Sequence, residues 1–249
     1  ADTTGAVVAL ALGAAYRNLT DVDGFYTTNP HENDDAQHIA ALTYRESRIL
    51  ALGGSNLLHH EVARLLSNTG LPTILCSTFG DSSNETVVSR NLASSEIRSD
   101  FIGVASREVR VLDVARVGMD DEVSTMDQLQ SELGRAGVSH LLSNGGPDEA
   151  TMVFSREAVE LDELQSVAEQ SLGGAEIRTQ DLGMVVVALA QSDEYALRLA
   201  QVSTAAREAD SGVVPIGNLS ARSVVLLTTS ESRNDVERAV HQLICAPNL

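Results

Sequence analysis

The chain has 249 residues and a formal net charge of −18, from 35 acidic and 17 basic residues, and it contains no lysine and no tryptophan. Such a negative surface repels nucleic-acid phosphates and anionic membranes, so we expect neither as a partner. With 43% hydrophobic residues, the chain can bury the core of one large or several small domains. The lack of lysine fits a source adapted to high salt or a GC-rich genome, and both explanations stay open.

The cysteines and the apolar N-terminal segment bear on where the protein is found. Cys76 and Cys245 are far apart and neither belongs to a Cys-X-X-Cys pair, which argues against a disulfide framework and favours the reducing cytoplasm. Residues 5–15 resemble the apolar core of a signal peptide, but they lack a basic flank and are too short to span a bilayer. We therefore expect a buried helix there, packed on most of its faces.

The first 89 residues alternate between strand-like and helical patterns. Beyond the apolar run, helices are expected at residues 43–52 and 57–66, and strands at 16–19, 73–77 and 86–89. Residues 20–30 form a polar, turn-rich loop that contains two carboxylates, three threonines and a tyrosine. The loop is either a solvated connection or a segment that holds a polar ligand.

The composition turns polar near residues 90–97, where we place a domain boundary, and the pattern after it repeats. The first copy has expected strands at 109–117, 138–142 and 150–154, and helices at 123–135 and 161–172. The second copy has strands at 184–190, 213–216 and 223–228, and helices at 194–208 and 234–243. Two such units form a pair of small sandwiches, each with helices on an antiparallel sheet.

Two clusters of polar residues have structural explanations that compete with a binding role. His59, His60 and Glu61 look like metal ligands, but neighbouring helical residues diverge by roughly 100° and cannot share one ion. We therefore expect a structural role for His59 and no metal ligands in the chain. The acids at 120–122 also have a structural explanation, which competes with a binding role, because acidic residues complement the dipole of a helix start.

Several motifs, in order along the chain, resemble those of the aspartokinases, the amino-acid kinases that phosphorylate aspartate. Residues 1–6 resemble the end of the family's glycine-rich Gly-Gly-Ser-Asp-Thr-Thr-Ala motif, and residues 20–30 resemble its nucleotide-binding loop. Further similar segments lie at 42–46, 54–59, 71–75 and 85–88. The two repeats resemble the tandem ACT domains of this family.

The resemblance implies an α/β fold with three parts. Residues 1–92 would form part of an amino-acid-kinase α/β sandwich, and two α+β, ferredoxin-like ACT domains would follow at 93–180 and 181–249. In the family one ACT unit is inserted into the other. The strand near 101–105 is therefore assigned either to the first unit or to the second.

The resemblance also implies a reaction and roles for single residues. The family transfers a phosphoryl group from ATP, with Mg²⁺, to L-aspartate, which gives 4-phospho-L-aspartate. Asp2 would be catalytic and, with Thr3, would bind aspartate. The residues implied for the nucleotide are Thr20, Asp21, Tyr26, His31 and Asn56, and those implied for an amino-acid effector are Met119, Asp120, Val138, Ser139 and His140. A homodimer is expected, because ACT units pair.

Three departures from the family pattern weaken the expected activity. The chain begins inside the glycine motif, so the family's N-terminal half with its Lys-Phe-Gly-Gly segment is expected to be missing. His31 and Asn56 stand where the family has an arginine and a lysine on the phosphates, and positive charge there stabilises the transition state. His140 replaces an acidic residue that would pair with a lysine effector. We expect no kinase activity from this chain alone. The alternative is a non-catalytic ACT-domain regulatory protein that binds an amino acid or a full-length kinase subunit.

Overall fold

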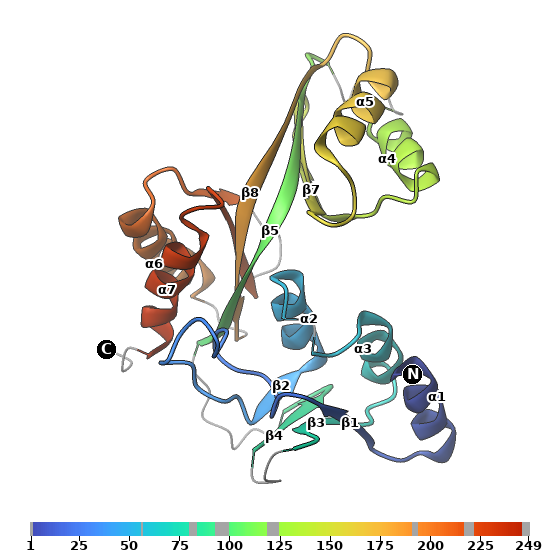
Figure 1. Ribbon diagram of the computed structural model, residues 1–249, viewed down its shortest axis with the longest axis vertical. Helices are drawn as coiled ribbons and strands as arrows, with labels where there is room; N and C mark the ends of the chain where they lie inside the picture. Colours follow the sequence, from blue (N-terminus) through green and yellow to red (C-terminus); the bar gives the residue numbers. More distant parts are fainter. Residues whose placement is uncertain are drawn as a thin grey trace. The chain divides into compact units, whose positions relative to one another are not determined.

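The computed structural model describes residues 2–55, 57–79, 84–92, 100–118, 125–190, 194–216 and 222–245. The chain folds into two compact units (Figure 1). Unit 1 comprises Ala1–Ser106, Val185–Leu226 and Asn234–Leu249, and unit 2 comprises Arg107–Met184 and Leu227–Arg233. The boundaries expected from the sequence, at 92/93 and 180/181, separate a kinase part from two regulatory repeats. The two units are defined by compactness instead, so they do not test these boundaries, which remain a prediction.

The N-terminal part of unit 1 is a four-stranded sheet with three helices. The strand order is β1-β3-β4-β2, in which β1 is parallel to β3, β2 is parallel to β4, and β3 and β4 are antiparallel. The strands are β1 (Tyr16–Thr20), β2 (Ala41–Thr43), β3 (Thr73–Ser77) and β4 (Glu85–Ser89). The helices are α1 (Asp2–Leu12), α2 (Tyr44–Leu52) and α3 (His60–Ser67). The strands and helices expected here are thus confirmed, with small shifts of their ends.

Side chains near the two later helix starts explain where those helices begin. Thr43 and Glu46 form a reciprocal capping box at α2, which satisfies two otherwise unpaired backbone N–H groups. At α3, the imidazole Nδ1 of His59 accepts a hydrogen bond from the N–H of Glu61, and the helix begins only at residue 60. The structure thus assigns His59 the structural role that was expected.

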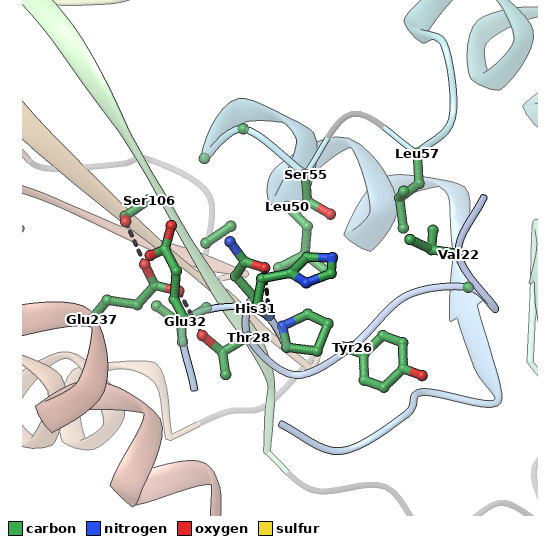
Figure 2. A pocket seen from close by; sticks show the side chains of 17 residues that line it. Val22, Tyr26, Thr28, His31, Glu32, Leu50, Ser55, Leu57, Ser106 and Glu237 are labelled. Atoms are coloured by element: carbon green, nitrogen blue, oxygen red, sulfur yellow. Dashed lines mark hydrogen bonds between the residues drawn. The ribbon is translucent and has the colours of Figure 1, made fainter. Parts of the chain in front are cut away.

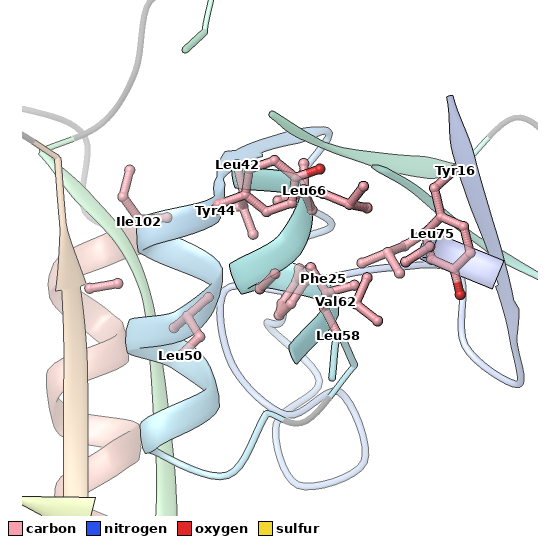
Figure 3. Close-up of a cluster of buried hydrophobic side chains, with 14 of the residues drawn as sticks. Tyr16, Phe25, Leu42, Tyr44, Leu50, Leu58, Val62, Leu66, Leu75 and Ile102 are labelled. Atoms are coloured by element: carbon pink, nitrogen blue, oxygen red, sulfur yellow. The ribbon is translucent and has the colours of Figure 1, made fainter. Parts of the chain in front are cut away.

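A hydrophobic cluster joins this sheet, its helices and the loop that follows β1 (Figure 3). Phe25, from the loop, is completely buried, and Leu50 of α2 and Leu75 of β3 belong to the same cluster. A large aromatic ring in the core is a strong anchor, because its removal from water stabilises the fold by several kcal/mol, roughly 3–5 for a Phe→Ala change. The loop is therefore tied to the core at one end.

The prediction that residues 5–15 form a helix buried on most faces is wrong about its burial. The helix α1 exists, but only Ala6 and Ala9 are buried, whereas Val7 and Val8 are about half exposed and Leu12 is 74% exposed. The sequence pattern failed because α1 is apolar all round and has no polar side that would mark a surface. Among the described residues, nothing covers its second face.

The rest of the chain forms two α+β repeats that share their long strands. Both β5 (Phe101–Ala115) and β8 (Glu176–Leu189) contribute residues to each unit. In unit 2 the order is β6-β7-β5-β8, and in unit 1 it is β5-β8-β10-β9. The other elements are α4 (Thr125–Arg135), β6 (His140–Gly145), β7 (Glu149–Ser155), α5 (Leu161–Ser171), α6 (Tyr195–Ala209), β9 (Val214–Ile216), β10 (Ser223–Thr228) and α7 (Arg233–Cys245).

Each repeat thus has a β-α-β-β-α-β arrangement with the strand order fourth-first-third-second. In the repeat of unit 1, the fourth strand is the start of β5, which precedes the other three strands in the chain. Each repeat also has its own core: Leu112, Leu129 and Leu164 are completely buried in unit 2, and Val187, Leu226 and Val240 in unit 1. The α/β class with two α+β units is thereby confirmed.

The sequence pattern underestimated both long strands. β5 has 15 residues and β8 has 14, whereas expected strands covered 109–117 and 184–190, with a separate strand near 101–105. Residues 176–181 are polar except for Ile177, and they alternate between exposed and partly buried, so hydropathy did not reveal this half of β8. Among the described residues, no helix is long and apolar enough to cross a membrane.

Thr86 of β4 fixes the base of the loop that carries Phe25. The backbone N–H of Phe25 donates to the Thr86 hydroxyl oxygen at 2.9 Å, and this hydroxyl donates to the carbonyl of Ile39 at 2.6 Å. Gly24 has φ = 148°, and a Cβ atom at this position would collide with the Thr86 side chain. The loop therefore needs both the glycine and the hydroxyl.

We predict that Thr86→Val lowers the free energy of unfolding by about 1–3 kcal/mol, because the valine keeps the shape but leaves two buried backbone groups without these partners. Thr86→Ser, which keeps the hydroxyl and loses only a methyl group, is the control and should lose less. Urea denaturation of both variants measures the difference. Equal losses for valine and serine would contradict a role for the two hydrogen bonds.

Candidate functional site

A cavity of about 260 Å³ lies beside the loop after β1, within unit 1 (Figure 2). Four segments contribute to its wall: the loop at 22–32, the end of α2 with the residues that follow it, β5 and α7. Its apolar wall includes Val22, Tyr26, Leu50, Leu57 and Val104, and its polar wall includes Thr28, Asn29, His31, Glu32, Ser55, Ser106 and Glu237. Residues more than 200 positions apart in the chain thus form one site.

The loop turns back on itself, and hydrogen bonds fix both of its arms. Thr27 donates its N–H to the carbonyl of Gln37 at 2.8 Å, and the N–H of Gln37 donates to the Thr27 hydroxyl oxygen at 3.0 Å. The rings of Tyr26 and His38 meet edge to face, with centroids 5.5 Å apart. At the tip, the side chain of Asn29 accepts the N–H of His31 at 3.1 Å. The loop is therefore an ordered part of the wall.

Two close approaches join the loop and α2 to β5. The N–H of Val104 donates to the carbonyl of Thr27 at 2.8 Å, so β5 continues its hydrogen bonding onto the loop. Gly53, just after α2, lies against Ala105, and a Cβ atom at this glycine would be 2.6 Å from the Ala105 carbonyl oxygen. Only glycine permits this contact between the α2 end and the strand.

On the opposite wall, α7 presents a buried carboxylate. Glu237 is 5% exposed, and its side chain accepts hydrogen bonds from the hydroxyls of Thr28, at 2.6 Å, and Ser106. One turn further along α7, His241 lies within 2.9 Å of the Thr27 hydroxyl and 3.1 Å of the Asn33 amide. Figure 2 shows the Glu237 contacts and the side chain of Glu32 beside them.

Burial changes the proton affinity of three side chains around the loop. Burial lowers the pKa of His241 below its ordinary value, although the carboxylates of Asp35 and Glu237 oppose the shift. Burial also lowers the pKa of His38, against the effect of Asp23. The pKa of the Tyr26 phenol is raised by burial and by Asp23, so the phenol stays protonated near neutral pH.

The structure brings some of the predicted nucleotide residues together. Tyr26 and His31 line the cavity. Thr20 and Asp21 lie at the end of β1, just before the first lining residue, and do not line it. Asn56 lies outside the described residues, although its neighbours Ser55 and Leu57 line the cavity.

The predicted catalytic and effector residues lie elsewhere. Asp2 and Thr3 are exposed in the first turn of α1 and do not line the cavity. Met119 and Asp120 lie outside the described residues. Val138 is buried in the core of unit 2, and Ser139 and His140 are exposed next to it, at the start of β6. They are not among the residues lining a separate hollow of unit 2, at Asp113, Glu149 and Thr151.

Sequence reasoning missed Glu237, Ser106 and Glu32. Glu237 lies in a helix rich in charged residues, where a glutamate normally faces solvent, so nothing in the sequence marked it as buried. Ser106 lies within a strand that the pattern divided into two. Of these three residues, only Glu32 could have been found from the sequence, because it lies two residues after Pro30, the last residue of the predicted loop.

The composition of the wall limits what the cavity can hold. Its apolar side, with the Tyr26 ring, suits a flat or apolar group. At the other side, Glu32 and Glu237 supply two carboxylates, and His31 is the one basic side chain among the described lining residues. The polar side therefore favours hydroxyl or amino groups over phosphate oxygens.

Comparisons with known proteins agree with the motifs. The model of the Amino acid kinase family matches residues 1–77. The bifunctional aspartokinase/homoserine dehydrogenase of Haemophilus influenzae is 23% identical over 255 residues, which cover 98% of this chain and 31% of that protein. Aspartokinase 3 of Bacillus subtilis is 35% identical over 107 residues, 42% of this chain and 23% of that one.

A solved structure supports the fold over almost the whole chain. E. coli aspartokinase III in complex with aspartate and ADP superimposes with a TM-score of 0.80 at 18% identity, and the match covers 98% of this chain and 56% of that one. The chain thus spans about a quarter to three-fifths of the length of the proteins it matches. These findings confirm the resemblance: the chain is similar to aspartokinases over almost its whole length, and residues 1–77 match the amino acid kinase family.

Proposed function

We propose that this chain functions in an aspartate kinase, the enzyme that converts ATP and L-aspartate to 4-phospho-L-aspartate. We also propose that its cavity binds the nucleoside of ATP. The observation that carries the proposal is the position of the loop at 20–30. Its motif resembles the family's nucleotide loop, it lies within the segment that matches the kinase family, and it forms one wall of the cavity. The E. coli relative was solved with aspartate and ADP.

The size and wall of the cavity fit a nucleoside better than a whole nucleotide. Its volume of about 260 Å³ lies just below the usual range of ligand pockets, which is roughly 300–1,000 Å³. Tyr26, Leu50 and Leu57 offer apolar surface to a base. Glu237 and Glu32 can accept hydrogen bonds from ribose hydroxyls, whereas they repel phosphates.

The phosphates and Mg²⁺ then need other residues. Among the described residues, no group of three or more His, Cys, Asp or Glu side chains is placed to hold a metal ion. Mg²⁺ commonly binds through substrate phosphates with only one or two protein carboxylates, so the proposal does not require a dedicated cluster of ligands. The start of α1, with Asp2 and Thr3, offers unpaired N–H groups to an anion and is the region we assign to aspartate and the transferred phosphate.

The remaining roles belong to the same proposal. Met119, Asp120, Val138, Ser139 and His140 would contact an amino-acid effector, two copies of the chain would pair through their repeats, and the protein would act in the cytoplasm. An imidazole at His140 provides no carboxylate for a lysine ammonium group. The proposal therefore favours an uncharged side chain in the effector over lysine.

A non-catalytic regulatory role is the second candidate. It is favoured by the two carboxylates at the cavity and by the absence of arginine from its described lining. Such a protein would bind an amino acid without binding a nucleotide. Calorimetric titration with lysine, threonine and methionine, and separately with ADP, distinguishes the two, because amino-acid binding without ADP binding would favour the regulatory role.

We predict that Tyr26→Ala weakens ADP binding by roughly 3–10-fold, which corresponds to the loss of an aromatic contact. Tyr26→Phe keeps the ring and should bind within about twofold of the unaltered chain, because the ring supplies the contact. Isothermal titration of the three proteins measures this. If Tyr26→Ala binds ADP as tightly as the unaltered chain, the ring does not contact the base.

We further predict that His31→Arg tightens the binding of ADP and leaves the binding of adenosine unchanged. An arginine adds a permanent positive charge and a bidentate donor for phosphate, and adenosine has no phosphate to meet it. The comparison of the two ligands supplies the control. Equal changes for both ligands would place residue 31 away from the phosphates.

The purified chain should form no acyl phosphate from ATP and aspartate. Each missing phosphate-stabilising donor commonly reduces the rate by roughly 10²–10³, and His31 and Asn56 replace two basic residues of the family pattern. Hydroxylamine trapping of the product is a sensitive assay. Aspartate-dependent turnover by the chain on its own would refute this expectation.

A further inference from the structure

Two polar side chains of α7 contact two consecutive residues of the candidate nucleotide loop. Glu237 accepts the hydroxyl of Thr28 at 2.6 Å, and His241 lies 2.9 Å from the hydroxyl oxygen of Thr27. Positions 237 and 241 are four residues apart, so both side chains leave the same face of the helix. All of these residues belong to unit 1.

Both side chains are almost completely buried, and both make hydrogen bonds. Glu237 is 5% exposed and His241 is 1% exposed. Burying such groups destabilises a fold unless hydrogen bonds replace those with water. Glu237 also accepts from Ser106, and both ring nitrogens of His241 have partners. The Asn33 side-chain nitrogen can only donate, so Nδ1 of His241 must accept its hydrogen bond. The ring proton of the neutral imidazole is therefore on Nε2, which donates to the Thr27 hydroxyl oxygen.

A neighbouring face of α7, roughly 100° around the helix from Glu237 and His241, is anchored in the core of the α+β repeat. Val236 and Val240 are completely buried in the cluster formed with β8 and β10. Each lies one position before one of the two polar residues. The helix therefore holds the repeat with its valines and the loop with Glu237 and His241.

We infer that Glu237 and His241 are positioning residues, through which the α+β repeat holds the nucleotide loop in its binding conformation. Tyr26 and His31, which line the cavity, lie on either side of the pair Thr27 and Thr28 that α7 fixes. Glu237 also lines the cavity, so the position of α7 and the occupancy of the cavity affect each other. The nucleotide is taken from the proposed function, on which this inference rests.

The test measures amide hydrogen exchange of residues 25–38 without nucleotide, together with ADP affinity. In His241→Leu the loop loses both contacts of the ring, and we expect exchange at residues 25–38 to rise and ADP binding to weaken, each by roughly 3–10-fold. His241→Gln presents an acceptor and a donor in similar places and should restore both to within about twofold. Such a rescue is not expected if the ring only fills space.

Two further variants guard against a general loss of stability. Val240→Ala removes core packing from the same helix without touching the loop, so it should lower the melting temperature and leave loop exchange unchanged. Asn33→Ala, at a partly exposed position, removes the partner of Nδ1 and also the side-chain oxygen that accepts the N–H of Asp35 at 3.0 Å. It should loosen the loop even if His241→Leu fails to fold, and a rise in exchange that reaches Thr27 and Thr28 reports the loss of the ring contact rather than of the local bond to Asp35.

Three outcomes would overturn the inference: unchanged loop exchange in both His241→Leu and Asn33→Ala, failure of His241→Gln to rescue, or an equal effect of Val240→Ala. If the unaltered chain does not bind ADP, the proposed function fails. Loop exchange still decides whether α7 holds the loop, because that measurement needs no nucleotide.

Discussion

The site depends on Thr27, which makes hydrogen bonds through all of its polar atoms. Its N–H and hydroxyl oxygen pair with Gln37 on the returning arm, its carbonyl accepts from Val104 of β5, and its hydroxyl contacts His241 of α7. A single residue thus joins the two arms of the loop, a strand and a helix. Loops of this length are usually mobile, and here four hydrogen bonds around one threonine give the loop a defined position.

The same arrangement explains why a polar loop contributes to a core. Phe25 is two positions before Thr27, and it lies in the hydrophobic cluster because Thr86 accepts its N–H. The Phe25 ring contributes buried apolar surface, and the hydrogen bonds of Thr27 and Thr86 determine where the loop lies. Tyr26, between them, is held at the cavity from both sides, so its ring can contact a ligand without much loss of freedom.

Under the proposed function, electrostatics would act differently on the base and on the phosphates of a nucleotide. The chain carries a net charge of −18, and two carboxylates lie at the polar end of the cavity. A nucleotide would therefore be repelled by the surface charge, and apolar contacts and hydrogen bonds near Tyr26 would have to supply the attraction. High ionic strength would screen the repulsion among exposed charges, which connects the acidic composition with the salt-adapted source considered from the sequence.

The sequence predicted local structure well and long-range structure poorly. Hydrophobic periodicity located most helices and strands, and the motif at residues 20–30 pointed to the loop that forms the cavity wall. The sequence did not reveal Glu237 or His241. In an amphipathic helix with many charged residues, hydropathy cannot distinguish a polar side chain that contacts the protein from one that contacts water. It also placed α1 in the interior, since composition shows that a helix is apolar but not whether a partner covers it.

The shared strands explain why the repeats and the kinase segment cannot be treated as separate modules. β5 supplies Val104 and Ser106 next to the loop, and its later residues, Val109–Ala115, pair with β7 in the other unit. β8 likewise contributes Ala188 to the core beneath the loop and Val187 to the core of the repeat. A change in the repeat that shifts either strand would therefore change the hydrogen bonds of Thr27 and the position of Glu237. Under the proposed function, a change in the repeats would thus reach the binding cavity through continuous backbone.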